Sequence, residues 1–377
     1  MSKVKLGDVA IEHKETCGGS KDGYPIVGLE HLTPEEVTLT AWDEDSDNTF
    51  TKVFRKGNVL FGRRRAYLRK AAVAPFDGIC SGDITVIEAI PDRILPELLP
   101  FIIQNDGLFS FAVGKSAGSL SPRVKWEHLK NYEFELPSMD RQCELAELLW
   151  AMDTTKKSYQ KLIAATDELV KSQFMEQFGS YLGDETRCAT VEQVCTVFAD
   201  GDWIESKDQA DDGIRLIQTG NVGNGVYLDK GERARYIDEE TFVRLNCTEV
   251  LPNDILISRL PDPVGRGCII PDGLGKSITA VDCSIVRLKS HVLPEFFVAY
   301  TMTTLYAAQI GSSVTGSTRK RISRKNLGQV VIPTPDIDQQ EQFAAFVRQS
   351  DKSKFELEQA LVELNATYKR IIAENLG

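Results

Sequence analysis

The 377-residue chain matches itself at a shift of about 198 residues. Residues 94–99 (Ile-Leu-Pro-Glu-Leu-Leu) align with residues 292–297 (Val-Leu-Pro-Glu-Phe-Phe), and Phe178-Gly179 aligns with Leu376-Gly377. The register holds without a gap from residue 94 to residue 179, whereas further upstream the shift falls to 196 and then to 190. Because a repeat of this length describes a recurring structural unit, the sequence predicts two units of one fold, variable in length at the front and constant at the back.

Each repeat ends in a segment that predicts a long helix. Residues 138–178 contain no Pro or Gly, and Pro137 and Pro335 precede the two segments while Gly179 and Gly377 follow them. Each helix of about 40 residues would extend roughly 60 Å. A heptad frame places one apolar seam on each helix, with Lys156 and Lys354 as matching breaks; its members are Leu145, Leu149, Met152, Tyr159, Ile163, Thr166 and Val170, then Phe343, Val347, Leu357, Leu361, Leu364, Tyr368 and Ile371.

Two apolar seams of equal length in one chain most simply bury each other as an antiparallel pair. The alternative is that each helix pairs with another molecule, but an intramolecular partner has the advantage of high effective concentration. We therefore expect two similar domains at opposite ends of a helical rod, related by an approximate two-fold axis.

The segments before the helices are rich in short β-type runs such as 59–61, 84–87, 255–257 and 284–287, bounded by Gly, Pro, Asp and Asn. Short helices are expected at 96–105 and 294–310, and exposed loops at 35–50 and 200–212. This mixture predicts an α+β fold. The expected division is a first domain at 1–136, a first long helix at 137–179, a second domain at 180–334 and a second long helix at 335–377.

Known catalytic motifs are missing from the sequence. Gly114-Lys115-Ser116 and Gly275-Lys276-Ser277 look like the ends of phosphate-binding loops, but Phe109 and Ile270 stand where the first glycine is required. The four histidines are scattered and form no metal-ligand spacing. We therefore predict a chain that is not an enzyme, with no catalytic residue, metal or cofactor of its own.

The eight cysteines lie at least seven residues apart, so they form no CxxC pair, and they are expected to be small core residues in a reducing cytoplasm. No run of 18 apolar residues occurs, and no apolar run follows the first lysines. The expected location is the cytoplasm, without a membrane span.

Charge is unevenly distributed along the chain. The total of −11, from 44 Lys and Arg against 55 Asp and Glu, argues alone against a nucleic-acid ligand. Residues 52–70, however, hold eight basic residues and no acid, and residues 296–335 also lack acids. A solvated basic face without a partner is the usual explanation of one such run, but its recurrence in both halves favours nucleic acid. The candidate DNA contacts are Arg63, Arg64, Arg65, Tyr67, Arg69, Arg123 and Lys125 in the first half, and Arg259, Arg266, Arg319, Lys320, Arg321, Arg324 and Lys325 in the second.

Over essentially its full length the chain resembles the specificity subunits of Type I restriction-modification systems. The most specific similarity lies in four segments: 213–222 (Gly-Ile-Arg-Leu-Ile-Gln-Thr-Gly-Asn-Val), 253–259 (Asn-Asp-Ile-Leu-Ile-Ser-Arg), Gly316-Ser317 through Ile322-Ser323, and 332–335 (Ile-Pro-Thr-Pro) leading into 340–342 (Gln-Glu-Gln). Members of this family carry two target-recognition domains, each followed by a long helix.

The resemblance implies that each domain recognises one half of a bipartite double-stranded DNA target and that the helices set the number of unread base pairs between the halves. It also implies two methyltransferase subunits as partners, which bind S-adenosylmethionine and flip adenine, and an optional restriction or translocase subunit. Helix faces near Trp150 and Phe174 are candidate docking surfaces for the methyltransferase; the alternative is that both residues widen the helical seam.

Two alternatives belong to other classes. The acidic total favours a scaffold in which a coiled coil presents two protein-binding domains without DNA, and a nuclease or methyltransferase with an unrecognised site is opposed by the missing motifs. If the chain reads DNA, its negative total predicts weak, salt-sensitive binding by the isolated chain, with methyltransferase partners supplying much of the positive charge.

Overall fold

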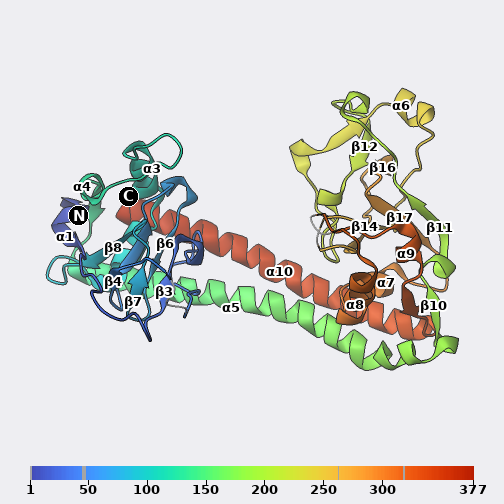
Figure 1. The fold of residues 1–377 in the computed structure, drawn as a ribbon, viewed down its shortest axis with the longest axis horizontal. Helices are drawn as coiled ribbons and strands as arrows, with labels where there is room; N and C mark the ends of the chain where they lie inside the picture. Colours follow the sequence, from blue (N-terminus) through green and yellow to red (C-terminus); the bar gives the residue numbers. More distant parts are fainter. Residues whose placement is uncertain (1, 45–47, 262, 317–318) are drawn as a thin grey trace. The chain divides into compact units, whose positions relative to one another are not determined.

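The computed structural model describes residues 2–44, 48–261, 263–316 and 319–377. The chain divides into two compact units: unit 1 comprises the residues up to Lys161 together with Glu358–Gly377, and unit 2 comprises Leu162–Leu357. The two long helices, α5 (Met139–Phe178) and α10 (Ile337–Leu376), each contribute one half to each unit (Figure 1). Helices and small sheets are mixed in both units, which confirms the predicted α+β class.

The described residues of unit 1 form three small sheets with the strand orders β2-β8-β5-β6, β3-β7-β4 and β1-β9. Its strands are β1 (Ser2–Lys5), β2 (Ala10–Glu12), β3 (Ile26–Val27), β4 (Lys52–Phe54), β5 (Val59–Gly62), β6 (Ala71–Val73), β7 (Gly78–Cys80), β8 (Ile84–Ala89) and β9 (Glu133–Leu136). Its short helices are α1 (Leu6–Val9), α2 (Leu99–Ile103), α3 (Asp106–Gly114) and α4 (Trp126–Leu129).

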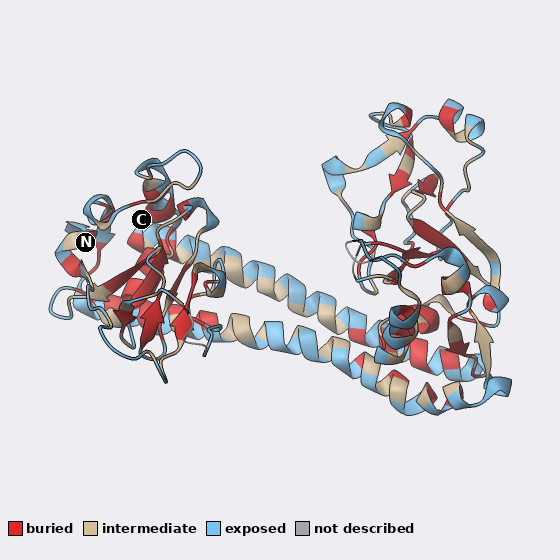
Figure 2. Cartoon of the chain, viewed as in Figure 1, coloured by how far each residue is buried: buried red, intermediate tan, exposed pale blue. Residues whose placement is uncertain are grey.

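Unit 2 repeats this plan with the strand orders β11-β17-β14-β15, β13-β12-β16 and β10-β18. Its strands are β10 (Cys188–Thr190), β11 (Cys195–Asp200), β12 (Ile214–Ile217), β13 (Arg235–Ile237), β14 (Ile255–Ser258), β15 (Gly267–Ile269), β16 (Ser277–Thr279), β17 (Cys283–Leu288) and β18 (Val331–Pro333). Its helices are α6 (Glu239–Arg244), α7 (Pro294–Thr301), α8 (Thr304–Ser313) and α9 (Arg324–Gly328). The buried strands of each unit stand out in Figure 2.

Matching sheets confirm the internal repeat and also show where the halves differ. The four-stranded sheets are antiparallel throughout and connect their strands in the same order. In the three-stranded sheets, β3 and β7 are parallel, as are β12 and β16, but the third strand attaches differently: β4 pairs with β7, whereas β13 pairs with β12. This difference falls in the front part of each repeat, where the sequence register is lost.

The two long helices pair in antiparallel fashion within each unit, as predicted. In unit 1, Leu145 and Leu149 near the start of α5 share a core with Ile372 and Leu376 at the end of α10. In unit 2 the other halves share a core that contains Val170, Phe174, Phe343 and Val347. All the predicted seam residues are buried or half-buried, as expected for the apolar side of a paired helix.

A buried glutamine fixes the start of each long helix. Gln142 accepts a hydrogen bond from Leu95 N–H through Oε1 at 2.9 Å, and its Nε2 donates to the carbonyl of Pro137 at 2.9 Å. Gln340 does the same with Leu293 N–H at 2.9 Å and Pro335 at 2.8 Å, and also donates to His291 O at 2.9 Å. The repeat shift of 198 residues therefore carries over from the sequence to individual hydrogen bonds.

The prediction that 35–50 is an exposed loop is wrong for residues 37–39. Val37 and Leu39 are each 3% exposed, and Leu39 N–H donates to Val73 O, so this segment runs beside β6. In the other expected loop, Asp200 ends β11 and Asp208 is buried against Arg244. Burial in such short irregular segments cannot be predicted from hydrophobic periodicity, because two buried side chains are too few to show a period.

The prediction that the cysteines are core residues holds for only some of them. All eight are free thiols; Cys80, Cys268 and Cys283 are buried, but Cys143 is exposed at the start of α5. Burial raises the pKa of Cys80 and Cys268 to about 12 and the pKa of Cys283 to about 11, because the thiolate is poorly solvated there.

We expect a maleimide at pH 8 to modify Cys143 within minutes and to leave Cys80, Cys268 and Cys283 unmodified until the protein unfolds, because the thiolate is the reactive species. Mass spectrometry of timed samples measures this order. Cys143→Ser should remove the fast reaction at that site, and rapid labelling of Cys283 in the folded protein would contradict the buried placement.

Among the described residues, no helix is both long and apolar enough to cross a bilayer.

Candidate nucleic-acid interface

In unit 1, the chain after β5 and the chain before α4 lie beside each other and bring their arginines together. Val124 N–H donates to Arg63 O at 3.0 Å, and Arg65 N–H donates to Pro122 O at 2.8 Å. The side chain of Arg123 donates to both carboxylate oxygens of Asp83, at 2.6 and 3.2 Å, and Arg64 reaches the same carboxylate at 3.4 Å. We call Arg63, Arg64, Arg65, Arg123 and Asp83 the unit 1 arginine cluster.

Asp83 is the centre of this cluster, and its role was not predicted. Hydrogen bonding and charge from Arg123 hold the pKa of Asp83 below its usual range, so the carboxylate is ionised at neutral pH. Its main-chain carbonyl accepts from Arg63 N–H at 3.0 Å. One carboxylate thus orients two guanidinium groups that remain 39% and 41% exposed, and the cluster keeps a net positive charge.

The other predicted contacts of unit 1 lie close by in the chain. Arg65, Tyr67 and Lys125 are exposed. Arg65 and Arg69 have positive φ values of 54° and 55° and flank a single 3-10 turn, Ala66–Leu68, which turns Tyr67 outward. Arg69 is less available than expected, because its guanidinium pairs with Asp106 and lies 5.1 Å from the centre of the Phe109 ring.

Part of the basic run 52–70 is not available to a nucleic acid. The Lys52 ammonium donates to Ile84 O at 2.7 Å, and Lys70 donates to Leu29 O at 2.7 Å. Arg55 is paired with Glu15 and Asp77. These side chains satisfy main-chain carbonyls and carboxylates of unit 1, so Lys52, Arg55 and Lys70 are poor candidates for DNA contact.

Unit 2 contains the same arrangement at repeat-related positions. Ile322 N–H donates to Arg259 O at 3.2 Å, and Arg259 N–H donates to Asp282 O at 2.9 Å, as the equivalent groups of Val124, Arg63 and Asp83 do in unit 1. Arg321 pairs with the Asp282 carboxylate at 4.0 Å. The Nε atoms of both Arg63 and Arg259 are buried without a hydrogen-bond partner. We call Arg259, Arg321 and Asp282 the unit 2 arginine cluster.

The basic stretch after α8 is exposed. Arg319, Lys320, Arg321, Arg324 and Lys325 all lie on the surface. Arg324 is partly held by the end of β11, since it donates to Phe198 O at 2.9 Å and lies 3.4 Å from the Asp200 carboxylate. Ser317, which belongs to the predicted Gly316-Ser317 motif, lies outside the described residues.

Arg259 and Arg266 are placed differently from the other predicted contacts. Arg259 is 4% exposed, and its guanidinium donates to Val281 O. Arg266 donates to four main-chain carbonyls, those of Val222, Pro261, Pro263 and Thr219, at 2.6 to 3.0 Å. Because these donors are already used to join loops, both arginines support the surface of unit 2 and are poor candidates for direct DNA contact.

The two helix positions that were candidate docking surfaces pack inward. Phe174 is fully buried, with its ring centre 5.1 Å from that of Phe296 and 5.4 Å from that of Phe343. Trp150 is half-buried on Phe101 and donates from Nε1 to Glu97 O at 3.0 Å. The docking prediction is therefore wrong for Phe174, because no partner can reach a side chain within the core of unit 2.

Other possible sites are explained by local structure. Lys276 pairs with Glu239, and Gly114 ends α3. His13 lies between Glu88 at 2.7 Å and Glu15 at 3.2 Å. Within the described part of the chain, no three His, Cys, Asp or Glu side chains gather as a metal site.

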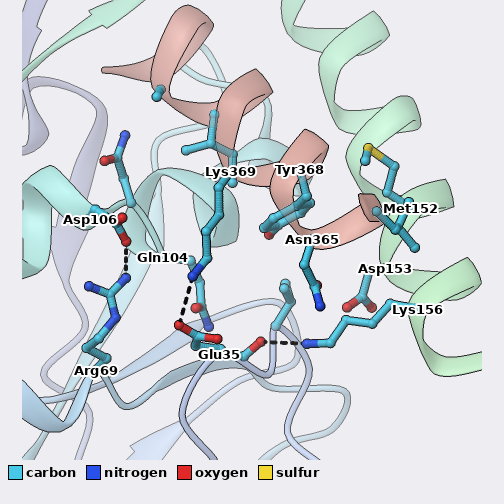
Figure 3. Close-up of a pocket in the computed structure, with 15 residues that line it drawn as sticks. Glu35, Arg69, Gln104, Asp106, Met152, Asp153, Lys156, Asn365, Tyr368 and Lys369 are labelled. Atoms are coloured by element: carbon cyan, nitrogen blue, oxygen red, sulfur yellow. Dashed lines mark hydrogen bonds and ion pairs between the residues drawn. The ribbon is translucent and has the colours of Figure 1, made fainter. Parts of the chain in front are cut away.

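A cavity of about 70 Å³ lies within unit 1, between the Glu35–Val37 segment, the start of α3 and both long helices (Figure 3). Its charged side chains are paired: Lys369 lies 3.3 Å from Glu35, Lys156 lies 3.3 Å from Glu36, and Arg69 pairs with Asp106. The Tyr368 hydroxyl is buried without a hydrogen-bond partner, and burial raises its pKa. We interpret the ion pairs around this cavity as the contacts that hold the 33–37 segment against the helices.

Comparison with known proteins finds one family model and one curated relative that match part of the chain. Residues 186–365 match the model of the family described as Type I restriction modification DNA specificity domain. Residues 186–365 therefore contain a domain of the Type I specificity-subunit family. The Escherichia coli protein named Type I restriction enzyme EcoDI specificity subunit is 25% identical over 183 residues, which cover 48% of this chain. The match spans only 37% of the length of that curated relative.

Two solved structures show the same fold as this chain. One comes from a study of complex assembly and conformational transition of the type I R-M system; it is 19% identical, with a TM-score of 0.61, and the match covers 99% of this chain and 97% of that one. The other is the Type-I restriction-modification system S subunit from M. genitalium, 11% identical with a TM-score of 0.54, covering 100% of this chain and 96% of that one. At these identities the similarity establishes the fold.

Proposed function

We propose that this chain is the DNA-reading subunit of a Type I restriction-modification complex and that it acts in the cytoplasm. Unit 1 reads one half of a bipartite double-stranded target and unit 2 reads the other, while the paired helices set the distance between them. Two methyltransferase subunits dock on the chain and carry S-adenosylmethionine and the catalytic residues, and restriction or translocase subunits join the same assembly. No catalytic residue is assigned to this chain.

The observation that carries this proposal is the repeated arginine cluster. In both units, arginines from two separate segments meet around one aspartate, and exposed cations lie next to them in the sequence: Arg65 and Lys125 in unit 1, and Arg319 and Lys325 in unit 2. Arginine is the side chain best suited to two-pronged contact with phosphate or guanine. Two such surfaces in one chain favour a target with two halves.

In the proposed reaction this chain only has to bind and orient DNA. A specificity subunit must bind and orient DNA so that a partner can reach the target base, and flipping and methyl transfer require a pocket and a cofactor that the partner supplies. The described residues of this chain fit the first task, because their charged groups face outward in loops on rigid small sheets.

The direct test is co-expression of this chain with its methyltransferase, followed by mapping of methylated bases on genomic DNA. A bipartite motif with an unread gap is expected. Stable co-purification without any sequence-dependent methylation would support the scaffold alternative and contradict the proposal.

Arg65→Ala and Lys125→Ala should each weaken DNA binding of the assembled complex about equally for all sequences, because exposed cations that touch phosphates carry no base information. The slope of log affinity against log salt should fall by about one for each change. Fluorescence anisotropy titrations with cognate and scrambled duplexes measure both effects. Lys56→Ala is the matched control, since Lys56 is exposed at the opposite end of β5; unaltered affinity of the Arg65 variant would remove unit 1 residues from the interface.

A further inference from the structure

Leu120 is 90% exposed, more than any other large apolar side chain among the described residues. It lies at the tip of the 117–123 loop between α3 and α4. Single exposed apolar residues are common on protein surfaces, so exposure alone would mean little. Two further observations indicate a role in binding: the loop that carries Leu120 is rigid, and cations lie around its tip.

The loop that carries Leu120 is held at both sides of its tip. Ala117 and Arg123 exchange two main-chain hydrogen bonds of 3.0 and 2.9 Å, and Gly118 adopts a φ of +115°, a value that suits glycine. The Ser121 hydroxyl accepts from Arg64 Nε at 2.9 Å, and Pro122 O accepts from Arg65 N–H. The unit 1 arginine cluster therefore fixes the base of the loop, and Leu120 is presented on a rigid support.

The charges around the tip match a polyanion. Arg64 and Arg123 are 39% and 41% exposed, and Arg65 and Lys125 are also exposed, whereas Asp83 is the carboxylate at the base and is 21% exposed. An apolar tip with cations on both sides fits a DNA groove, because phosphates line the groove edges and uncharged base edges form its floor. Apolar side chains can contact the thymine methyl group on the groove floor, and minor-groove proteins insert leucine between base steps.

We propose that Leu120 enters a groove of the first half-site and packs against base edges there, so that it determines specificity at one or two base pairs. This inference rests on the proposed DNA-reading function. The repeat shift of 198 places Thr318 at the equivalent sequence position in unit 2, and Thr318 lies outside the described residues. The inference therefore concerns the half-site read by unit 1.

The test compares Leu120→Ser and Leu120→Met in the complex assembled with its methyltransferase, using genome-wide methylation mapping and duplex binding. Leu120→Ser should lower methylation of cognate sites about tenfold and make one or two neighbouring positions of one half-site degenerate, a loss typical of a single mismatched base contact. The other half-site should be unchanged. Leu120→Met keeps an apolar side chain of similar size and should retain the wild-type motif.

Two further measurements separate the possible outcomes. The salt dependence of binding should be the same for Leu120→Ser and wild type, since no charge is removed, and the thermal midpoint should not change because the side chain is exposed. An unaltered motif and rate in Leu120→Ser, or equal weakening of all sequences, would overturn the inference and leave the proposed function intact. A wild-type complex that methylates no bipartite motif would overturn both.

Discussion

A heptad inserted into both long helices is expected to lengthen the unread gap of the methylation motif by about three base pairs. Seven helical residues add roughly 10.5 Å at 1.5 Å per residue, and B-DNA rises 3.4 Å per base pair. Inserting a whole heptad preserves the seam, because seven residues return the apolar positions to the same side of each helix. Methylation at the original spacing should be lost almost completely.

The insertion points follow from the antiparallel pairing. Positions between Gln160 and Lys161 in α5 and between Glu356 and Leu357 in α10 lie near the middle of the two helices and avoid both cores. The readout is methylation mapping with the co-expressed methyltransferase. A heptad in α5 alone is the matched control: it puts the two seams out of step and should abolish the complex without giving a new spacing. Retention of the original gap by the double insertion would contradict the proposal that the helices set the distance.

Gln340→Ala is expected to destabilise unit 2 by about 3 kcal/mol, because it removes three hydrogen bonds at a site with no exposed surface and leaves Leu293 N–H without its partner. Gln142→Ala should have a similar, slightly smaller effect on unit 1, since Gln142 makes two hydrogen bonds and is 2% exposed. The two variants therefore form a matched pair that reports on two units separately.

Hydrogen exchange measured by mass spectrometry is the suitable method, because a chain of two units need not unfold in a single step. Amides of β18 and α7 should exchange faster in Gln340→Ala, while those of β9 and α2 should change only in Gln142→Ala. Gln160→Ala, at an exposed position of α5, should alter neither. Equal acceleration of both units by either variant would show that the glutamines do not act locally.

The sequence predicts the fold well where the repeat register is intact. The long helices, predicted at 137–179 and 335–377, begin at Met139 and Ile337, and the alignment of Gln142 with Gln340 carries down to equivalent hydrogen-bond partners. Proline before each helix and glycine after it are local signals that do not depend on the rest of the fold. Helix pairing follows from the seam, because two apolar stripes of equal length and the same period can bury each other.

The candidate interface could be predicted only in part. A run of basic residues does not say which side chains point outward, and residues 52–70 are divided between β4, β5 and a 3-10 turn whose ends have left-handed backbone conformations at Arg65 and Arg69. Asp83 and Asp282 were missed because each lies about 20 residues from the first arginine that it contacts. Their similar placement in the repeats, 199 residues apart, was the available signal.

Arg259 and Arg266 illustrate a second limit. Both guanidinium groups donate to main-chain carbonyls of segments between the strands, that of Val281 for Arg259 and those of Val222 and Thr219 for Arg266. A loop whose carbonyls are not paired within the loop requires hydrogen-bond donors from elsewhere. Local sequence patterns do not predict which arginine will supply them.

The carboxylates of Asp83 and Asp282 have a consequence for the energetics of any ligand that approaches the arginines. A guanidinium that already holds an internal anion gains only the difference between its old and new partners, so an incoming phosphate competes for a donor that is in use. Binding is then an exchange of one anion for another, and the net gain in binding free energy is small for an arbitrary DNA sequence. Discrimination improves under such competition, since only a ligand that offers additional contacts around the same arginines can displace the resident carboxylate.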